Sequence, residues 1–223
     1  MQRFDQTAVA TPGTTSLPVN KVLRNTYLLL GITLLFSAAT AGLAMLLQAP
    51  HPGLIITLVG YFGLLFLTQK FRNSALSLVF VFALTGFMGF TLGPVISAYL
   101  KFFPNGHQLV AMAFAGTGII FVGLSSYVVV TRKDFSFAGG FLFTGILVAF
   151  LAGVGAWLFQ LPMLALAVST MFVLLMAGLI LFKTSEIIHG GETNYVMATV
   201  TLFVSIYNLF TSLLHLLGVF GDE

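Results

Sequence analysis

Five polar residues with a helical spacing lie near the end of the chain and are the residues best able to do chemistry. Successive members are four, three, four and three positions apart: Thr201, Ser205, Asn208, Ser212 and His215. This spacing places them on one stripe of a helix whose other residues are mainly large and apolar. A polar stripe in hydrocarbon has to face protein or water. It therefore predicts either interhelical hydrogen bonds or a solvated path, in which His215 titrates near neutral pH.

The segment 183–192 is strongly polar and forms the second candidate site. Glu186 and His189 are three positions apart, so a single metal ion could contact both side chains. A metal site of the Glu-x-x-His kind needs further ligands from other helices, and the sequence does not supply them clearly. We therefore expect a solvated loop that holds a Lys183–Glu186 ion pair, and no metal site.

The sequence does not indicate enzymatic chemistry. Its long apolar stretches contain no Asp or Glu, which excludes an aspartyl intramembrane protease, and the last stretch has no Lys for a retinal Schiff base. The chain also lacks cysteine, which excludes a disulfide scaffold, a thiolate zinc site and a cysteine nucleophile. We therefore expect a protein without catalytic residues or a cofactor, and not an enzyme.

The elements that carry these residues follow from hydrophobicity and from the gaps between charges. Hydrophobic residues make up 58% of the chain and charged residues 7%, against about 25% charged in soluble domains. Five long stretches carry no charge: 25–69, 73–100, 102–131, 135–182 and 193–221. One transmembrane helix needs about 20 apolar residues, and turns at 48–53 and 160–162 divide the two longest stretches. The sequence thus predicts an all-α integral membrane protein with seven transmembrane helices, because β-barrel strands would alternate in polarity.

The basic residues predict the orientation in the bilayer. With the N-terminus inside, eight of the nine Lys and Arg residues fall on the inner side and only Lys101 falls outside. The C-terminus then lies outside. Residues 1–20 are rich in Thr, Pro, Ala and Gly and are expected to form a flexible cytoplasmic tail before a transmembrane domain over 21–223. The net charge is only +3, so we expect contact with the lipid bilayer and not with nucleic acid.

Small residues in the stretch 73–100 predict close helix packing. Gly86, Gly89 and Gly93 are three and four positions apart, as in helices that approach each other closely. Pro94 follows Gly93 deep within the same stretch. This pair is expected to kink or unwind the helix.

Four motifs together resemble the enterobacterial-type branch of the Bax inhibitor family. They occur in order at 21–27 (KVLRNTY), 85–94 (TGFMGFTLGP), 131–137 (TRKDFSF) and 187–195 (IIHGGETNY). The resemblance covers residues 19–218. It implies a seven-helix bundle in the bacterial inner membrane, in which the last helix is surrounded by the other six and the C-terminus is periplasmic.

The resemblance also implies a function. Proteins of this branch are substrates and inhibitors of FtsH, a membrane-anchored ATP-dependent protease with associated membrane proteins. The implied mechanism is occupation of the protease by a slowly degraded substrate, for which the tail over 1–20 provides an unstructured handle.

The alternative function that the family implies is a pH-dependent leak of calcium or protons. In the leaking members two Asp residues control the flux, and their positions correspond to Lys183 and Ser205 here. Two carboxylates that share a proton can sense pH because their titrations are coupled, whereas Lys and Ser cannot. Lys183 would also repel calcium. The departure from the motif therefore weakens the alternative.

Overall fold

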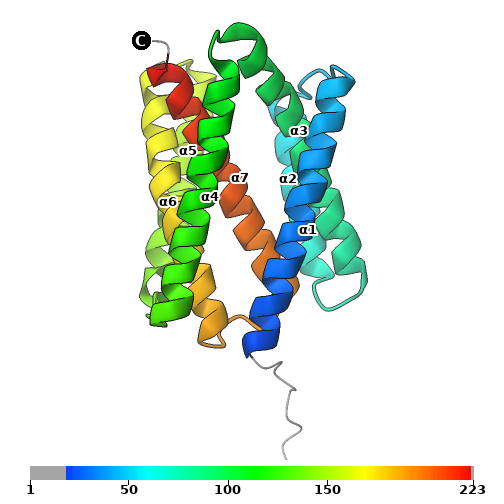
Figure 1. The fold of residues 1–223 in the computed structure, drawn as a ribbon, viewed down its shortest axis with the longest axis vertical. Coiled ribbons are helices and arrows are strands. Elements are labelled where there is room, and N and C mark those ends of the chain that lie inside the picture. Colours follow the sequence, from blue (N-terminus) through cyan, green and yellow to red (C-terminus); the bar gives the residue numbers. More distant parts are fainter. Residues whose placement is uncertain (1–18, 222–223) are drawn as a thin grey trace, which may run out of the picture.

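Seven α-helices and one short 3₁₀ helix make up residues 19–221, the part of the chain that the computed structural model describes (Figure 1). Their bounds are α1 Val19–Leu46, α2 Leu54–Lys70, α3 Leu76–Phe102, α4 Gly106–Thr131, η1 Ser136–Ala138, α5 Gly139–Leu158, α6 Pro162–Ile188 and α7 Tyr195–Phe220. The predicted turns at 48–53 and 160–162 are confirmed as the connections α1–α2 and α5–α6. The predicted tail falls on residues outside those described, except for Val19 and Asn20, which begin α1.

Six of these helices are long and apolar enough to cross a bilayer, and α2, with 17 residues, is shorter and apolar. Large apolar side chains such as Ile55, Phe141 and Leu174 are exposed on the outside of the bundle. A water-soluble protein would not expose so much contiguous apolar surface. The chain is therefore a multi-pass membrane protein, and the count of seven crossings stays a prediction.

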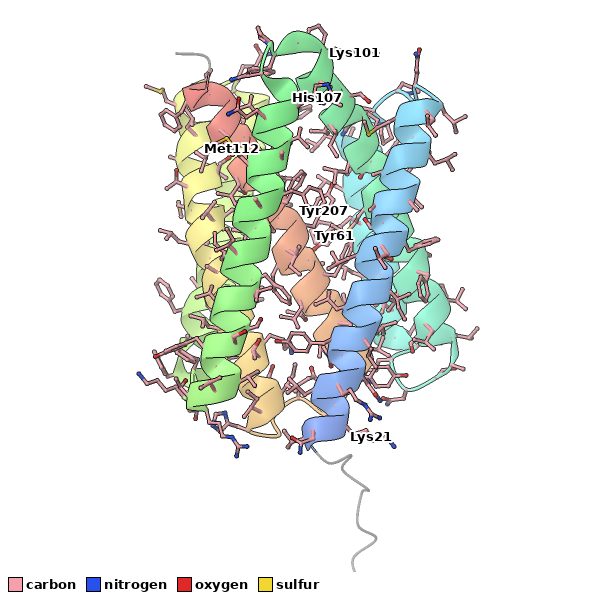
Figure 2. All side chains as sticks on the ribbon, viewed as in Figure 1. Lys21, Tyr61, Lys101, His107, Met112 and Tyr207 are labelled. Atoms are coloured by element: carbon pink, nitrogen blue, oxygen red, sulfur yellow. The ribbon has the colours of Figure 1, made fainter. Side chains whose placement is uncertain are left out.

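The two ends of the bundle carry different charge. Figure 2 places Lys21 at one end and Lys101, with His107, at the other. Because the helices alternate in direction, the C-terminal ends of α2, α4 and α6 lie at the Lys21 end together with most of the basic residues. We refer below to the Lys21 end and the Lys101 end.

Helices α1 and α3 pack against each other through the three predicted glycines. A Cβ atom at Gly86 would lie 2.7 Å from the ring of Phe36, and one at Gly93 would lie 2.6 Å from the carbonyl oxygen of Ala41. At Gly89 it would collide with the backbone oxygen of Ser37. Only glycine allows the two backbones to come this close. We call this contact the glycine seam; α3 continues as a helix through Gly93 and Pro94.

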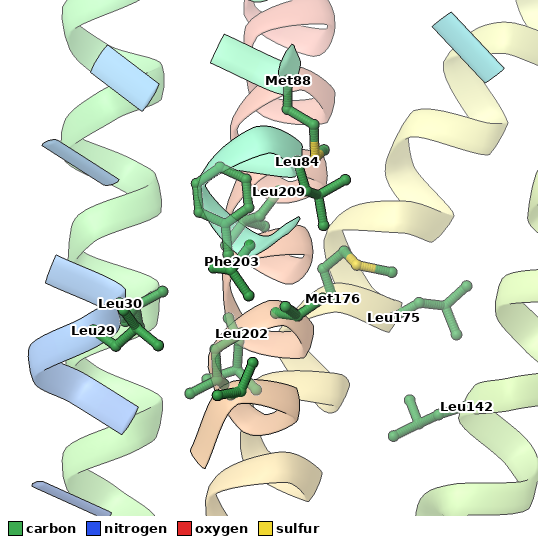
Figure 3. Close-up of a cluster of buried hydrophobic side chains, with 14 of the residues drawn as sticks. Leu29, Leu30, Leu84, Met88, Leu142, Leu175, Met176, Leu202, Phe203 and Leu209 are labelled. Atoms are coloured by element: carbon green, nitrogen blue, oxygen red, sulfur yellow. The ribbon is translucent and has the colours of Figure 1, made fainter. Parts of the chain in front are cut away.

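Helix α7 lies obliquely across the middle of the bundle in Figure 1, and it packs against α1, α3, α4 and α6. Helix α2 packs mainly on α3, and α5 mainly on α6. Figure 3 shows the main core, in which Leu202, Phe203 and Leu209 of α7 meet apolar side chains of the neighbouring helices. All three residues are at most 1% exposed. A last helix surrounded by all six others remains a prediction.

Candidate functional site

The polar stripe on α7 bonds mostly to its own helix. Thr201 donates to the carbonyl oxygen of Met197 at 3.0 Å, and Ser205 donates to that of Thr201 at 2.8 Å. The Asn208 amide donates to the carbonyl oxygen of Val204 at 2.8 Å. Ser212 is buried. The hydroxyl protons of Thr201 and Ser205 and one amide proton of Asn208 are therefore satisfied within α7.

His215 is the member of the stripe that contacts another helix. Its Nδ1 lies 2.8 Å from the hydroxyl of Ser169 on α6, and that hydroxyl donates its own proton to the carbonyl oxygen of Ala165 at 3.0 Å. When the serine donates to Ala165, its oxygen accepts from Nδ1–H of His215, and Nε2 is then the acceptor in the neutral ring. Both residues line an open cavity of about 790 Å³ near the Lys101 end, between α5, α6 and α7.

Lys183 forms the most concentrated charge cluster in the part of the chain described. Its Nζ atom lies 2.7 Å from a carboxylate oxygen of Glu186 and 2.9 Å from one of Glu192. The predicted Lys183–Glu186 pair is confirmed, but the predicted solvated loop is wrong at this residue. Because α6 extends to Ile188, Lys183 is part of the helix and is only 9% exposed. We call Lys183, Glu186 and Glu192 the inner cluster.

Two polar residues next to the inner cluster fasten the α4–α5 connection to α6. Ser185 accepts a hydrogen bond from the backbone N–H of Phe135 at 2.9 Å and donates to the carbonyl oxygen of Lys133 at 3.2 Å. The ring nitrogens of His189 lie 2.9 Å and 3.1 Å from the carbonyl oxygens of Ser185 and Arg132. A neutral ring can donate to only one of these oxygens, and an imidazolium to both.

Asp134 shapes the same connection. The backbone N–H of Ser136 donates to its carboxylate at 2.8 Å, and this bond, which favours the charged form, lowers the pKa of Asp134. The carboxylate therefore stays ionised and holds the turn that leads into η1.

Asn194 joins the α6–α7 connection to α7 and to the end of α2. Its side-chain oxygen accepts hydrogen bonds from the backbone N–H groups of Val196 and Met197, so it caps α7. Its amide nitrogen donates to the carbonyl oxygen of Arg72 at 2.9 Å. At the Lys21 end, hydrogen bonds between side chains and backbone groups therefore involve the α2–α3, α4–α5 and α6–α7 connections.

Sequence reasoning missed a second group of polar residues in the middle of the bundle. Tyr61, Thr91 and Tyr207 come from α2, α3 and α7, and together with Asn208 they line a cavity of about 370 Å³. Tyr61 and Tyr207 were hidden among 24 phenylalanines and other apolar residues. No spacing rule links residues on three different helices, so the sequence carried no signal for this group.

Glu186 and His189 are the pair that the sequence offered to a metal ion. Within residues 19–221, no three His, Asp or Glu side chains are close enough to hold a metal ion together. Glu186 and His189 are also engaged elsewhere, the first by Lys183 and the second by two carbonyl oxygens.

Residues 19–222 match the family described as Inhibitor of apoptosis-promoting Bax1. Together with the apolar helices, this match defines the class: the chain is a multi-pass helical membrane protein that belongs to the Bax inhibitor family. The motifs at 21–27, 85–94, 131–137 and 187–195 all lie within the matched region.

Several bacterial proteins are similar to this chain over almost its whole length. The modulator of FtsH protease YccA of Escherichia coli is 52% identical over 92% of this chain and 93% of its own. The inner membrane protein YccA of a second Escherichia coli strain has the same identity and coverage. An uncharacterised membrane protein of Vibrio cholerae is 41% identical over 93% of each chain.

Proposed function

We propose that this chain modulates a membrane-anchored ATP-dependent protease of the FtsH type, and that it acts as a slowly degraded substrate. The observation that carries the proposal is the 52% identity, over 92% of the chain, to a protein named modulator of FtsH protease. The proposed role is regulation and not catalysis. A protease with its associated membrane proteins is then the partner, in addition to the lipid bilayer.

The packing of the bundle supports slow degradation. A protease that pulls a chain out of the membrane has to separate the glycine seam, where α1 lies directly against α3. It also has to break the inner cluster, which joins α6 to the segment before α7. Contacts that must break before extraction raise the barrier to unfolding and slow the protease.

The proposed location is the bacterial inner membrane, with the Lys21 end in the cytoplasm and the C-terminus in the periplasm. A relative is named inner membrane protein, and the concentration of Lys and Arg at the Lys21 end follows the positive-inside rule. The proposed arrangement has seven crossings, with α7 enclosed by the other helices. Residues 1–18, the part of the predicted tail that precedes α1, would then provide a handle that a cytoplasmic protease can reach.

The direct test is degradation in proteoliposomes that contain the purified protease, a membrane reporter substrate and this chain. We expect the chain to slow degradation of the reporter while it is itself degraded slowly. Deletion of residues 1–18, which leaves α1 intact from Val19, should block its own degradation. A variant whose residues 1–18 are scrambled is the matched control and should be degraded like the original.

Two results would contradict the proposal in different ways. Unchanged degradation of the reporter at saturating amounts of the chain would reject the modulator role. Equal turnover of the truncated and complete chains would reject only the handle. Affinity purification from gently solubilised membranes should recover the protease with its membrane partners, and recovery of the protease by the truncated chain would place the contact on the bundle.

A calcium or proton leak has the support of family membership alone. At the position of the first family acid, Lys183 is buried and paired with two carboxylates, so a cation already occupies the place. At the second position, Ser205 donates its proton within α7. We therefore expect flux into liposomes that contain the pure protein to equal that of empty liposomes from about pH 5 to pH 8, the range in which a histidine titrates.

A further inference from the structure

The cavity in the middle of the bundle has apolar walls and a small group of polar side chains. It measures about 370 Å³ and lies between α2, α3, α5, α6 and α7. Ligand pockets in proteins typically measure about 300–1,000 Å³ and combine an apolar lining with a few convergent polar groups. None of the residues that line this cavity is charged.

The polar groups of the cavity have unused hydrogen-bonding capacity. The hydroxyl groups of Tyr207 and Thr91 are 3.5 Å apart, and Thr91 donates its proton to the carbonyl oxygen of Met88. The Tyr61 hydroxyl makes no hydrogen bond to any other residue in the described range 19–221. Asn208 donates to Val204, while its side-chain oxygen accepts nothing within that range. The cavity therefore offers at least one free donor and one free acceptor.

The cavity opens sideways between α2 and α5. Phe62 and Leu147 at its rim are each 48% exposed, whereas Thr91 and Met176 at its floor are 2% exposed. The rings of Phe62 and Phe150 meet edge to face at 5.7 Å and bridge the two helices at this opening. Figure 2 places Tyr61 and Tyr207 close together at mid-height of the bundle.

The depth of the cavity decides what kind of molecule can occupy it. The opening faces the apolar outside of a membrane bundle, so the free hydroxyl groups meet hydrocarbon and not water. Charged groups are costly at the centre of a bilayer. A partner for Tyr61 and Tyr207 therefore has to be dissolved in the membrane and carry an uncharged polar group.

We propose that this cavity binds a neutral single-chain lipid. Its hydroxyl oxygen reaches Tyr61 and Tyr207, and its chain leaves between Phe62 and Leu147 into the bilayer. Tyr61 donates to the lipid oxygen, and a lipid hydroxyl donates in turn to the side-chain oxygen of Asn208. This binding site does not depend on the proposed modulation of a protease.

Photolabelling of the complete chain in lipid nanodiscs tests the proposal, with a hexadecanol that carries a diazirine on its chain as the probe. We expect saturable crosslinks to peptides of α2, α5 and α6, which unlabelled hexadecanol suppresses and hexadecyl phosphate does not. Tyr61→Phe should raise the half-saturating concentration about fivefold, which corresponds to one hydrogen bond. Leu147→Trp should block the opening and lower the labelling, whereas Leu151→Trp, one turn further along the exposed side of α5, should not.

The outcomes that overturn the proposal are equally specific. Labelling that does not saturate and spreads over the outer surface of the bundle would show only contact with the bilayer. Equal competition by hexadecyl phosphate would reject a neutral head group. Thermal unfolding checks that Tyr61→Phe and Tyr207→Phe are folded. If both folded variants leave the half-saturating concentration unchanged, the hydroxyl groups do not bind the lipid.

Discussion

Helices α1 and α3 on one side, and α2 and α5 on the other, show two opposite ways for helices to meet in this bundle. In the glycine seam the backbones are so close that a single methyl group at Gly89 has no room. Between α2 and α5 a cavity of about 370 Å³ remains, bridged by one pair of aromatic rings. The first contact holds the bundle together, and the second leaves space and hydrogen-bonding groups for another molecule.

The Lys21 end resembles the glycine seam, because its contacts also hold separate segments together. There four polar side chains join separate segments: Lys183 contacts two carboxylates, Ser185 and His189 contact the α4–α5 connection, and Asn194 contacts α7 and Arg72. In the middle of the bundle Tyr61 and Asn208 keep free capacity. Stability and ligand binding are thus assigned to different parts of the same helices, and substitutions should separate them.

The largest effect is expected where the seam is broken. Gly89→Val places a branched side chain against the backbone oxygen of Ser37, which cannot move without separating α1 from α3. We expect a loss of about 3 kcal/mol in the free energy of unfolding, the upper part of the range for overpacked cores. Thermal unfolding in detergent measures it. Gly31→Ala is the control, because a Cβ there meets nothing within 4 Å, and equal losses for both variants would contradict the seam.

The next largest effect is expected at the inner cluster. Lys183→Met leaves the carboxylates of Glu186 and Glu192 without their cation, and these side chains are 28% and 18% exposed. Removal of one partner from a fully buried pair costs about 3–5 kcal/mol, and partial exposure reduces this to about 2 kcal/mol here. Chemical unfolding of Lys183→Met measures the loss. Lys101→Met, at the other end of the bundle, should have no effect, and Lys183→Arg should recover most of the stability.

A smaller effect on stability is expected from the removal of single hydroxyl groups. The Thr199 hydroxyl has a partner on another helix, whereas the Tyr61 hydroxyl lines the cavity. The Thr199 hydroxyl lies 3.2 Å from the carbonyl oxygen of Thr26 on α1 and 2.7 Å from that of Tyr195. Thr199→Val should therefore lower stability by about 0.6 kcal/mol, the average for such bonds in membranes. Tyr61→Phe should lower it less, because the hydroxyl has no partner within residues 19–221. A larger loss for Tyr61→Phe than for Thr199→Val would show that the cavity hydroxyl is already satisfied.

The smallest effect is expected from pH at the α4–α5 connection. The hydrogen bond from Ser136 lowers the pKa of Asp134 below its unfolded value of about 3.9. Stabilisation by this carboxylate is therefore fully present above that value and is lost as the pH falls through the folded pKa. Asp134→Asn should remove this acid-dependent part of the unfolding curve. A titration of Asp134 by NMR that gave a normal or raised pKa would contradict the contact.

Much of the architecture could be predicted from the sequence, because the constraints of a bilayer apply along the direction in which each helix crosses it. Its thickness sets the length of an apolar helix, and the cost of charge in hydrocarbon places Lys and Arg near the helix ends and in the connections. The helices, the turns at 48–53 and 160–162 and the close-packing role of Gly86, Gly89 and Gly93 were therefore predictable. The Lys183–Glu186 pair was also predictable, since residues three apart on a helix are neighbours.

Only the tertiary structure decided which partners each polar group has. Glu192 joins Lys183 because the chain turns back after α6, and the burial of Lys183 depends on that turn. The stripe from Thr201 to His215 forms hydrogen bonds largely within α7. Helical spacing alone does not show whether such residues bond within their own helix or to another one. Tyr61, Thr91 and Tyr207 meet because three helices are rotated toward one cavity. Helix rotation is set by the packing of side chains between helices, and no local pattern in the sequence contains it.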